Sequence, residues 1–90
     1  MEVRIEKSFY KDLSSIKNKQ TALDVEEIII EIEEATLLNQ IHNLKKLKGD
    51  ATAYRIKYKD YRIGLFVEGR VVELVRFLHR KDIYRKFPPK

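Results

Sequence analysis

The sequence contains no cysteine and no apolar run long enough to span a bilayer. Without cysteine the chain forms neither a disulfide nor a thiolate metal site, and it is compatible with a reducing cytoplasm. A membrane-spanning helix needs about 20 consecutive apolar residues, and the opening segment from Met1 to Glu6 lacks the apolar core of a signal peptide. We therefore expect a cytoplasmic protein that does not enter a membrane.

Several motifs that carry common chemistries are also missing. The chain has no glycine-rich phosphate loop, no HExxH pair and no nucleophilic serine in a recognisable elbow. We therefore expect neither a metal nor a cofactor. The strongest amphipathic helix has an acidic polar face, which argues against binding at a membrane surface.

What the chain does contain is charge, and the charge is unevenly divided. Its 90 residues are 43% hydrophobic and 37% charged, which fits one small globular domain over residues 1–90. Residues 1–43 carry five Lys or Arg against nine Asp or Glu, whereas residues 44–90 carry fourteen against five. The net charge of +5 is thus concentrated in the second half. This asymmetry favours a nucleic acid or an acidic protein as partner over a generally basic, soluble surface.

The first half of the chain predicts a strand followed by two helices. The segment 3–6 alternates apolar and charged residues, as a short strand does. Ser8 is a candidate N-cap for a helix that begins near Phe9, and Thr21 with Asp24 resembles a capping box for a second helix. That second helix has an apolar stripe for packing, and its many glutamates are most simply a solvated back face.

The second half predicts an antiparallel meander. The segment from Leu37 to Leu47 is less regular and is expected to form a short helix or a helix extension. Three strands then follow at about Tyr54–Tyr58, Tyr61–Val67 and Arg70–Phe77. The order of elements predicts an α+β fold, in which two N-terminal helices pack on one face of an antiparallel sheet.

Two of these strands form a hairpin with an unusual polar face. If the chain reverses at Lys59-Asp60, Tyr58 lies opposite Tyr61 and Lys57 lies opposite Arg62. Two cations directly across from one another destabilise a sheet unless an anion lies between them. The hairpin therefore predicts a site for a polyanion.

The C-terminal segment 77–87 gathers residues that can move protons and stabilise negative charge, among them His79, Arg80 and Tyr84. Cleavage of RNA needs a base for the 2′-hydroxyl, cations for the phosphorane and an acid for the leaving oxygen. Tyr, His, Lys and Arg fill these roles without a metal. Each residue considered alone also has a structural interpretation. His79 would be an ordinary histidine at a strand end, and Tyr84 would be an aromatic residue that packs on a sheet edge.

Four segments occur in an order that is specific in combination: Leu44–Gly49, Tyr54–Lys57, Asp60–Ile63 and His79–Arg85. Together with the chain length and the two leading helices, they resemble the RelE/ParE superfamily of type II toxin–antitoxin toxins. The resemblance implies a microbial-RNase-like α+β fold. For the RelE branch it implies an mRNA interferase, an endoribonuclease that cuts mRNA in the 30S decoding site and so inhibits translation.

The residues and the resemblance together predict two overlapping sets of site residues. The candidate catalytic residues are Lys57, Arg62, His79, Arg80 and Tyr84. The candidate RNA-binding residues are Lys45, Lys46, Lys48, Arg55, Lys57, Lys59, Lys81 and Arg85. The chain departs from the branch in having Arg at position 55, a shorter gap between Arg80 and Tyr84, and a histidine at 79. That histidine allows an acid/base pair of His79 and Tyr84.

Two alternatives remain open at this point. A ParE-like toxin would inhibit DNA gyrase without cutting RNA, and an inactive relative would act only as an antitoxin-bound regulatory module. All three hypotheses predict a cognate antitoxin and a toxin–antitoxin hetero-oligomer. An acidic or amphipathic segment of the antitoxin is expected to cover the basic face, and an unpaired sheet edge is one possible docking line.

Overall fold

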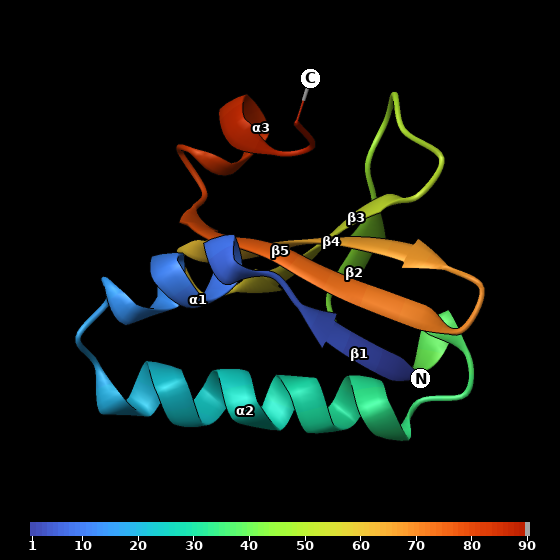
Figure 1. The fold of residues 1–90 in the computed structure, drawn as a ribbon, viewed down its shortest axis with the longest axis horizontal. Helices are drawn as coiled ribbons and strands as arrows, with labels where there is room; N and C mark the ends of the chain where they lie inside the picture. Colours follow the sequence, from blue (N-terminus) through green and yellow to red (C-terminus); the bar gives the residue numbers. More distant parts are fainter. Residues whose placement is uncertain (90) are drawn as a thin grey trace.

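The computed structural model describes residues 1–89, which form three α-helices, one 3-10 helix and five strands (Figure 1). In chain order the elements are β1 (Glu2–Ile5), α1 (Lys7–Ser14), α2 (Lys19–Glu34), η1 (Leu38–Gln40), β2 (Leu44–Lys46), β3 (Ala53–Tyr58), β4 (Tyr61–Glu68), β5 (Val71–His79) and α3 (Ile83–Lys86). The predicted α+β class is confirmed. The three strands predicted for the second half are present within two residues of their expected bounds.

The strands form one sheet in the order β1-β5-β4-β3-β2. β2, β3, β4 and β5 pair antiparallel with their neighbours, whereas β1 runs parallel to β5. The sheet is therefore mixed: the predicted antiparallel meander is present, and β1 adds a parallel strand at one edge. Parallel strands need a long crossover connection, and most of the chain, including both N-terminal helices, lies between β1 and β5.

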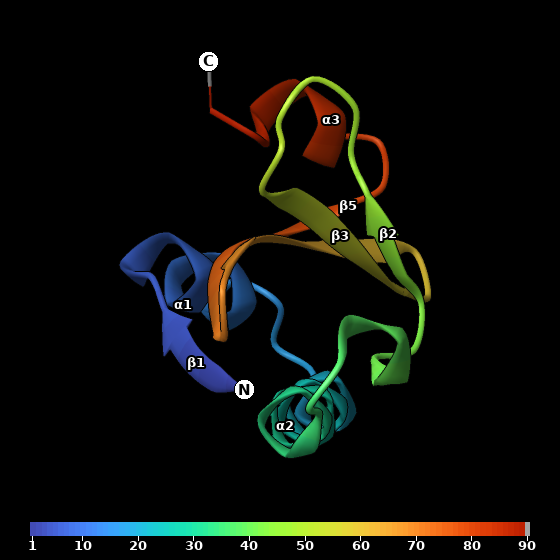
Figure 2. The same cartoon turned by 90° about the vertical axis from the view of Figure 1, so that its right-hand side faces the viewer.

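The sheet has two differently covered faces. α2 runs across one face with α1 beside β5, while α3 and the loop between β2 and β3 stand on the other side (Figure 2). We call these the helix face and the α3 face. The prediction that two N-terminal helices pack on one face is confirmed.

The main core lies on the helix face. Phe9 of α1 meets Phe77 of β5 edge-on, with ring centroids 6.0 Å apart. Val25 and Ile32 of α2 are also buried against the strands. Their fully buried partners in the sheet are Ile56, Ile63, Leu65, Val72 and Leu74. Burial of these side chains is the main force that holds the helices on the sheet.

A smaller apolar cluster fixes α3 on the opposite face. Ile83 and Phe87 are buried there against Ala53, with Leu78 packed beside them. The Phe87 ring lies so close to β4 that a Cβ at position 64 would come within 2.6 Å of it. Gly64 therefore lets the aromatic ring sit directly on the strand.

Both helix starts differ from the sequence prediction. α2 begins at Lys19, and the side chain of Asn18 accepts a hydrogen bond from the Thr21 N–H, so Asn18 is the cap and the proposed Thr21 capping box is wrong. α1 begins before Ser8, whose hydroxyl donates to the Val75 carbonyl on β5 instead of capping the helix. Within residues 1–89, no helix has the length and apolar character needed to cross a membrane.

The region from Leu37 to Leu47 is not the helix that the sequence predicted. It contains the short η1 and then the edge strand β2, which pairs with β3 from Leu44 opposite Ile56 to Lys46 opposite Tyr54. Asn43, with φ of 63°, turns the chain into the strand. β2 brings its lysines alongside the basic strand β3.

Candidate nucleic-acid interface

The β3–β4 hairpin has the register that the sequence predicts. Lys57 pairs with Arg62 and Tyr58 pairs with Tyr61. The reversal at Lys59-Asp60 places Lys59 at a φ of 50°, in the left-handed region. The expected juxtaposition of two cations is therefore confirmed.

These cations lie on the α3 face of the sheet. Ile56 is buried in the main core on the helix face, so the neighbouring residues Arg55 and Lys57 point the other way. Lys45 of β2 pairs with Arg55 and extends the same row. Four cations from three strands thus form one surface, which we call the cationic patch: Lys45, Arg55, Lys57 and Arg62.

No carboxylate neutralises the cationic patch among the described residues. Arg55 Nη1 donates to the Asn43 carbonyl at 2.7 Å, and Arg62 Nη1 donates to the carbonyls of Lys59 at 2.9 Å and Tyr61 at 2.8 Å. Carbonyl partners fix the two guanidinium groups without cancelling their charge. Within residues 1–89 the buried Arg55 Nε has no hydrogen-bond partner. The patch is therefore held in place and remains electrostatically available to a polyanion.

Arg80 lies beside the hairpin turn. Its N–H donates to the Asp60 carbonyl at 2.8 Å, which extends the pairing of β4 and β5 past the end of the strand. α3 begins only at Ile83, so Arg80 and Tyr84 do not lie in one helix. Arg80 is placed by the sheet, whereas Tyr84 is placed by α3.

His79 lies on the helix face of the sheet, whereas Arg62 lies on the α3 face. His79 pairs with Tyr61, and the two rings meet edge-on with centroids 5.7 Å apart. Tyr61 in turn stacks on the core residue Phe77 at 5.1 Å. His79 Nδ1 accepts a hydrogen bond from the Lys81 N–H at 3.1 Å. The structure does not bring His79 to the cationic patch.

Tyr84 lies in a second basic feature on the α3 face. Its side chain is 58% exposed and lines a groove of about 400 Å³ together with β2 and the start of the following loop. The groove residues are Lys45, Lys46, Leu47, Lys48, Tyr84, Phe87 and Pro88. We call this the lysine groove. Because Lys45 belongs to both features, the lysine groove adjoins the cationic patch.

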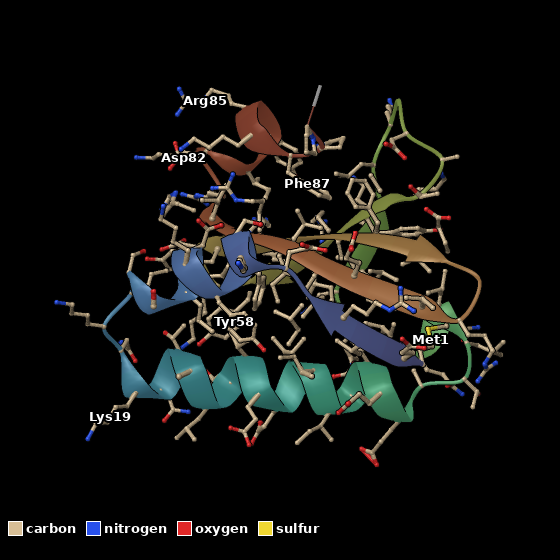
Figure 3. The ribbon with its side chains drawn as sticks, in the orientation of Figure 1. Met1, Lys19, Tyr58, Asp82, Arg85 and Phe87 are labelled. Atoms are coloured by element: carbon tan, nitrogen blue, oxygen red, sulfur yellow. The ribbon has the colours of Figure 1, made fainter. Side chains whose placement is uncertain are left out.

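The remaining candidate cations lie elsewhere. Lys59 Nζ is 3.9 Å from Asp24 and 5.4 Å from the Tyr58 ring, so it turns toward α2 on the helix face. Arg85 forms an ion pair with Asp82, and both side chains lie on the outside of α3 (Figure 3). Within residues 1–89, Lys81 has no side-chain hydrogen bond or ion pair.

Two buried or half-buried contacts that the sequence did not reveal hold the hairpin and β5 in place. The Tyr58 hydroxyl donates to Asp24 at 2.5 Å between the sheet and α2, which lowers the pKa of the Asp24 carboxyl (Figure 3). Asp12 of α1 accepts from Arg76 Nε at 2.7 Å and from the Phe77 N–H at 3.0 Å. The same carboxylate raises the pKa of the Arg76 guanidinium. Partners 34 and 64 residues apart leave no local sequence signal.

Among residues 1–89, no cluster of three or more His, Asp or Glu side chains is arranged to hold a metal ion. The cationic patch and the lysine groove contain guanidinium, ammonium and phenol groups. Such groups bind phosphate and stabilise negative charge that develops on it.

Comparison with known proteins supplies relatives but no matching family model. The chain is 38% identical over 89 residues to Toxin RelE3 of Methanocaldococcus jannaschii, an alignment that covers 98% of this chain and all of that protein. Among solved structures, it matches a RelB-RelE antitoxin-toxin complex from Methanococcus jannaschii with a TM-score of 0.78 and 36% identity over 94% of this chain and 99% of the other. The toxin–antitoxin complex RelBE2 of Mycobacterium tuberculosis matches with a TM-score of 0.67, over 90% of this chain and 92% of the other. At 20% identity, that likeness concerns the fold.

Proposed function

The chain belongs to the RelE-like toxins of toxin–antitoxin systems, and from this membership we propose that it is a ribosome-dependent mRNA endonuclease. The observation that carries the proposal is the cationic patch. In it Lys57 and Arg62 lie opposite one another, and neither forms an ion pair with a carboxylate of residues 1–89. A sheet that keeps this repulsion gains from it only when an anion binds. Cleavage on the ribosome would make the cytoplasm its place of action, and a cognate antitoxin would restrain it.

In this proposal the patch stabilises the transition state of RNA cleavage. The 2′-oxygen attacks the adjacent phosphorus, the new O2′–P bond forms and the P–O5′ bond breaks. The 2′-proton passes to a base and a proton reaches the leaving 5′-oxygen. Lys57 and Arg62 balance the extra negative charge on the phosphorane, and Arg80 supplies a further cation beside the turn.

The lysine groove would hold the RNA strand next to the reacting phosphate. Lys45 and Lys48 offer ammonium groups to the backbone, whereas the Lys46 ammonium donates to the Ala51 carbonyl at 3.0 Å and lies 5.8 Å from the centre of the Tyr54 ring. The exposed ring of Tyr84 offers a surface on which a base can stack. Of the two candidate proton carriers, Tyr84 is the one on the α3 face. We therefore assign proton transfer to Tyr84 and no catalytic role to His79.

The experiment is to map the 5′ ends of cellular mRNA after brief induction of the wild-type protein, of Arg62→Ala and of Lys59→Ala. Both substitutions remove one cation from the same hairpin, but Lys59 turns toward α2. We expect in-frame cuts with the wild type, about 100-fold fewer with Arg62→Ala, and nearly normal cutting with Lys59→Ala. Equal cutting by both variants contradicts the proposal. Gyrase inhibition in a supercoiling assay without mRNA cuts would point instead to ParE-like behaviour.

A further inference from the structure

The outward side of α2 carries an apolar ridge of large, exposed side chains. Leu23 is 57% exposed and Ile30 is 45% exposed. They are seven residues apart, so they lie two turns apart on the same side of the helix. Leu37, just beyond the helix end, is 59% exposed. The core side of α2 is formed by other residues, among them Val25 and Ile32.

Glutamates flank this ridge on both sides. At 100° per residue, Glu27 and Glu34 fall on one flank of the line from Leu23 to Ile30, and Glu26 and Glu33 fall on the other. All four are exposed, and none forms an ion pair within residues 1–89. Oxygen-tipped side chains project from the side of α2 that faces away from the sheet (Figure 3).

The charge arrangement is unfavourable for an isolated helix. Glu27 and Glu31 are like charges at the i,i+4 spacing, which weakens a helix. Glu33 and Glu34 occupy the last turn, where the helix dipole disfavours negative charge, and that turn contains no basic residue. A helix face that is only solvated needs polar side chains. That explanation does not account for an apolar ridge between two rows of glutamates.

The ridge continues into a groove along one flank. Glu27, Ile30, Glu31 and Glu34 line a depression of about 470 Å³ together with Gln40 of η1. Glu27 and Glu31 also line the next depression, of about 260 Å³, which runs toward β3. The side of α2 therefore offers length, apolar contact and negative charge in one place.

We propose that this surface, the α2 ridge, docks an amphipathic helix of the cognate antitoxin whose apolar stripe is bordered by lysine and arginine. The partner's apolar side chains would cover Leu23 and Ile30, and its cations would meet the two rows of glutamates. The inference rests on the family's pairing with antitoxins and not on RNA cleavage. The antitoxin would thus contact two surfaces of opposite charge, the cationic patch and the α2 ridge, through segments of opposite charge.

The test measures the affinity of purified full-length toxin for its cognate antitoxin. Glu27→Lys/Glu34→Lys reverses charge beside the ridge, and Ile30→Ser removes apolar contact. Glu2→Lys/Glu68→Lys is the matched control, because it changes the net charge equally at exposed positions on β1 and β4. We expect Glu27→Lys/Glu34→Lys and Ile30→Ser each to weaken binding at least about tenfold, and the control to stay within about twofold of the wild type.

Two further measurements, mRNA cleavage by the free variant and the oligomeric state of the toxin, distinguish the possible outcomes. mRNA cleavage by the free Glu27→Lys/Glu34→Lys variant should equal that of the wild type, so a failure of the docking surface is distinguishable from a failure of the catalytic proposal. Unchanged antitoxin affinity in both ridge variants overturns the inference. A wild-type toxin that dimerises alone, and that Glu27→Lys/Glu34→Lys makes monomeric, overturns it as well, because the ridge would then bind a second copy of the chain.

Discussion

The two faces of the β3–β4 hairpin treat polar side chains in opposite ways. On the helix face, the Tyr58 hydroxyl is satisfied by Asp24 and Tyr61 is stacked on Phe77. On the α3 face, Lys57 and Arg62 lie opposite one another with no carboxylate partner among the described residues. Side chains of neighbouring residues on one strand therefore have different roles. Those on the helix face stabilise the fold, and those on the α3 face remain charged and able to bind an anion.

The largest expected effect comes from comparing substitutions at two neighbouring residues of β4 that point to opposite faces of the sheet. Ile63 is fully buried on the helix face, and Arg62 precedes it on the same strand. Ile63→Ala should cost about 2–5 kcal/mol of unfolding free energy, because it leaves a cavity in the core. Arg62→Ala should change stability by less than about 0.5 kcal/mol while removing mRNA cleavage. Urea unfolding of both variants measures the first quantity. Similar destabilisation of the two would mean that Arg62 has a structural role.

The next effect compares two candidate proton carriers on opposite faces. Tyr84→Phe keeps the ring but removes the phenol, and we expect cleavage to fall about 100-fold. His79→Phe keeps an aromatic ring beside Tyr61, and cleavage should change only a few-fold. Single-turnover cleavage on programmed ribosomes measures both. If His79→Phe loses more activity than Tyr84→Phe, the assignment of proton transfer to the α3 face is wrong.

The hairpin register could be predicted from the sequence because two strands of alternating apolar and charged residues meet at one short polar turn. The face of the sheet on which His79 lies could not be predicted from the sequence. The pairing of β4 with β5 shifts between Gly64 and Leu65, so Gly64 lies opposite Arg76 while Leu65 lies opposite Leu74. The extra residue on β5 reverses the alternation, and it moves Phe77 and His79 to the face that Leu74 occupies.

Other features were missed because their causes are not local. The edge strand β2 has three residues, two of them lysines, and such a segment has little strand propensity of its own. Its pairing with β3 decides its conformation. Asn18 caps α2 although Thr21 and Asp24, three residues further on, have the spacing of a capping box. The Asp12–Arg76 contact joins residues that only the completed fold brings together.

A smaller effect comes from the hydrogen bond that seals the helix face. Tyr58→Phe removes the donor to Asp24 and keeps the ring between the sheet and α2. We expect a loss of about 1.5–3 kcal/mol in unfolding free energy, typical of one hydrogen bond to a charged group, and little change in cleavage. Tyr54→Phe is a suitable control, because the Tyr54 hydroxyl forms no hydrogen bond with any of residues 1–89. Equal losses in the two variants would mean that the phenol at position 58 contributes nothing specific.

The smallest effect is a pH dependence that belongs to the same bond. The hydrogen bond from Tyr58, followed by that from Gln20, lowers the pKa of the Asp24 carboxyl below its ordinary value of 3.8. An acid whose pKa is lower in the folded state stabilises the fold above its unfolded pKa, and that stabilisation disappears as the pH falls through the folded pKa. The stability difference between the wild type and Asp24→Asn should therefore be constant near neutral pH and shrink below about pH 4. Urea unfolding of both proteins from pH 7 to pH 3 measures this difference. A difference that stays constant over that range would show that the ionisation of Asp24 does not contribute to the stability of the fold.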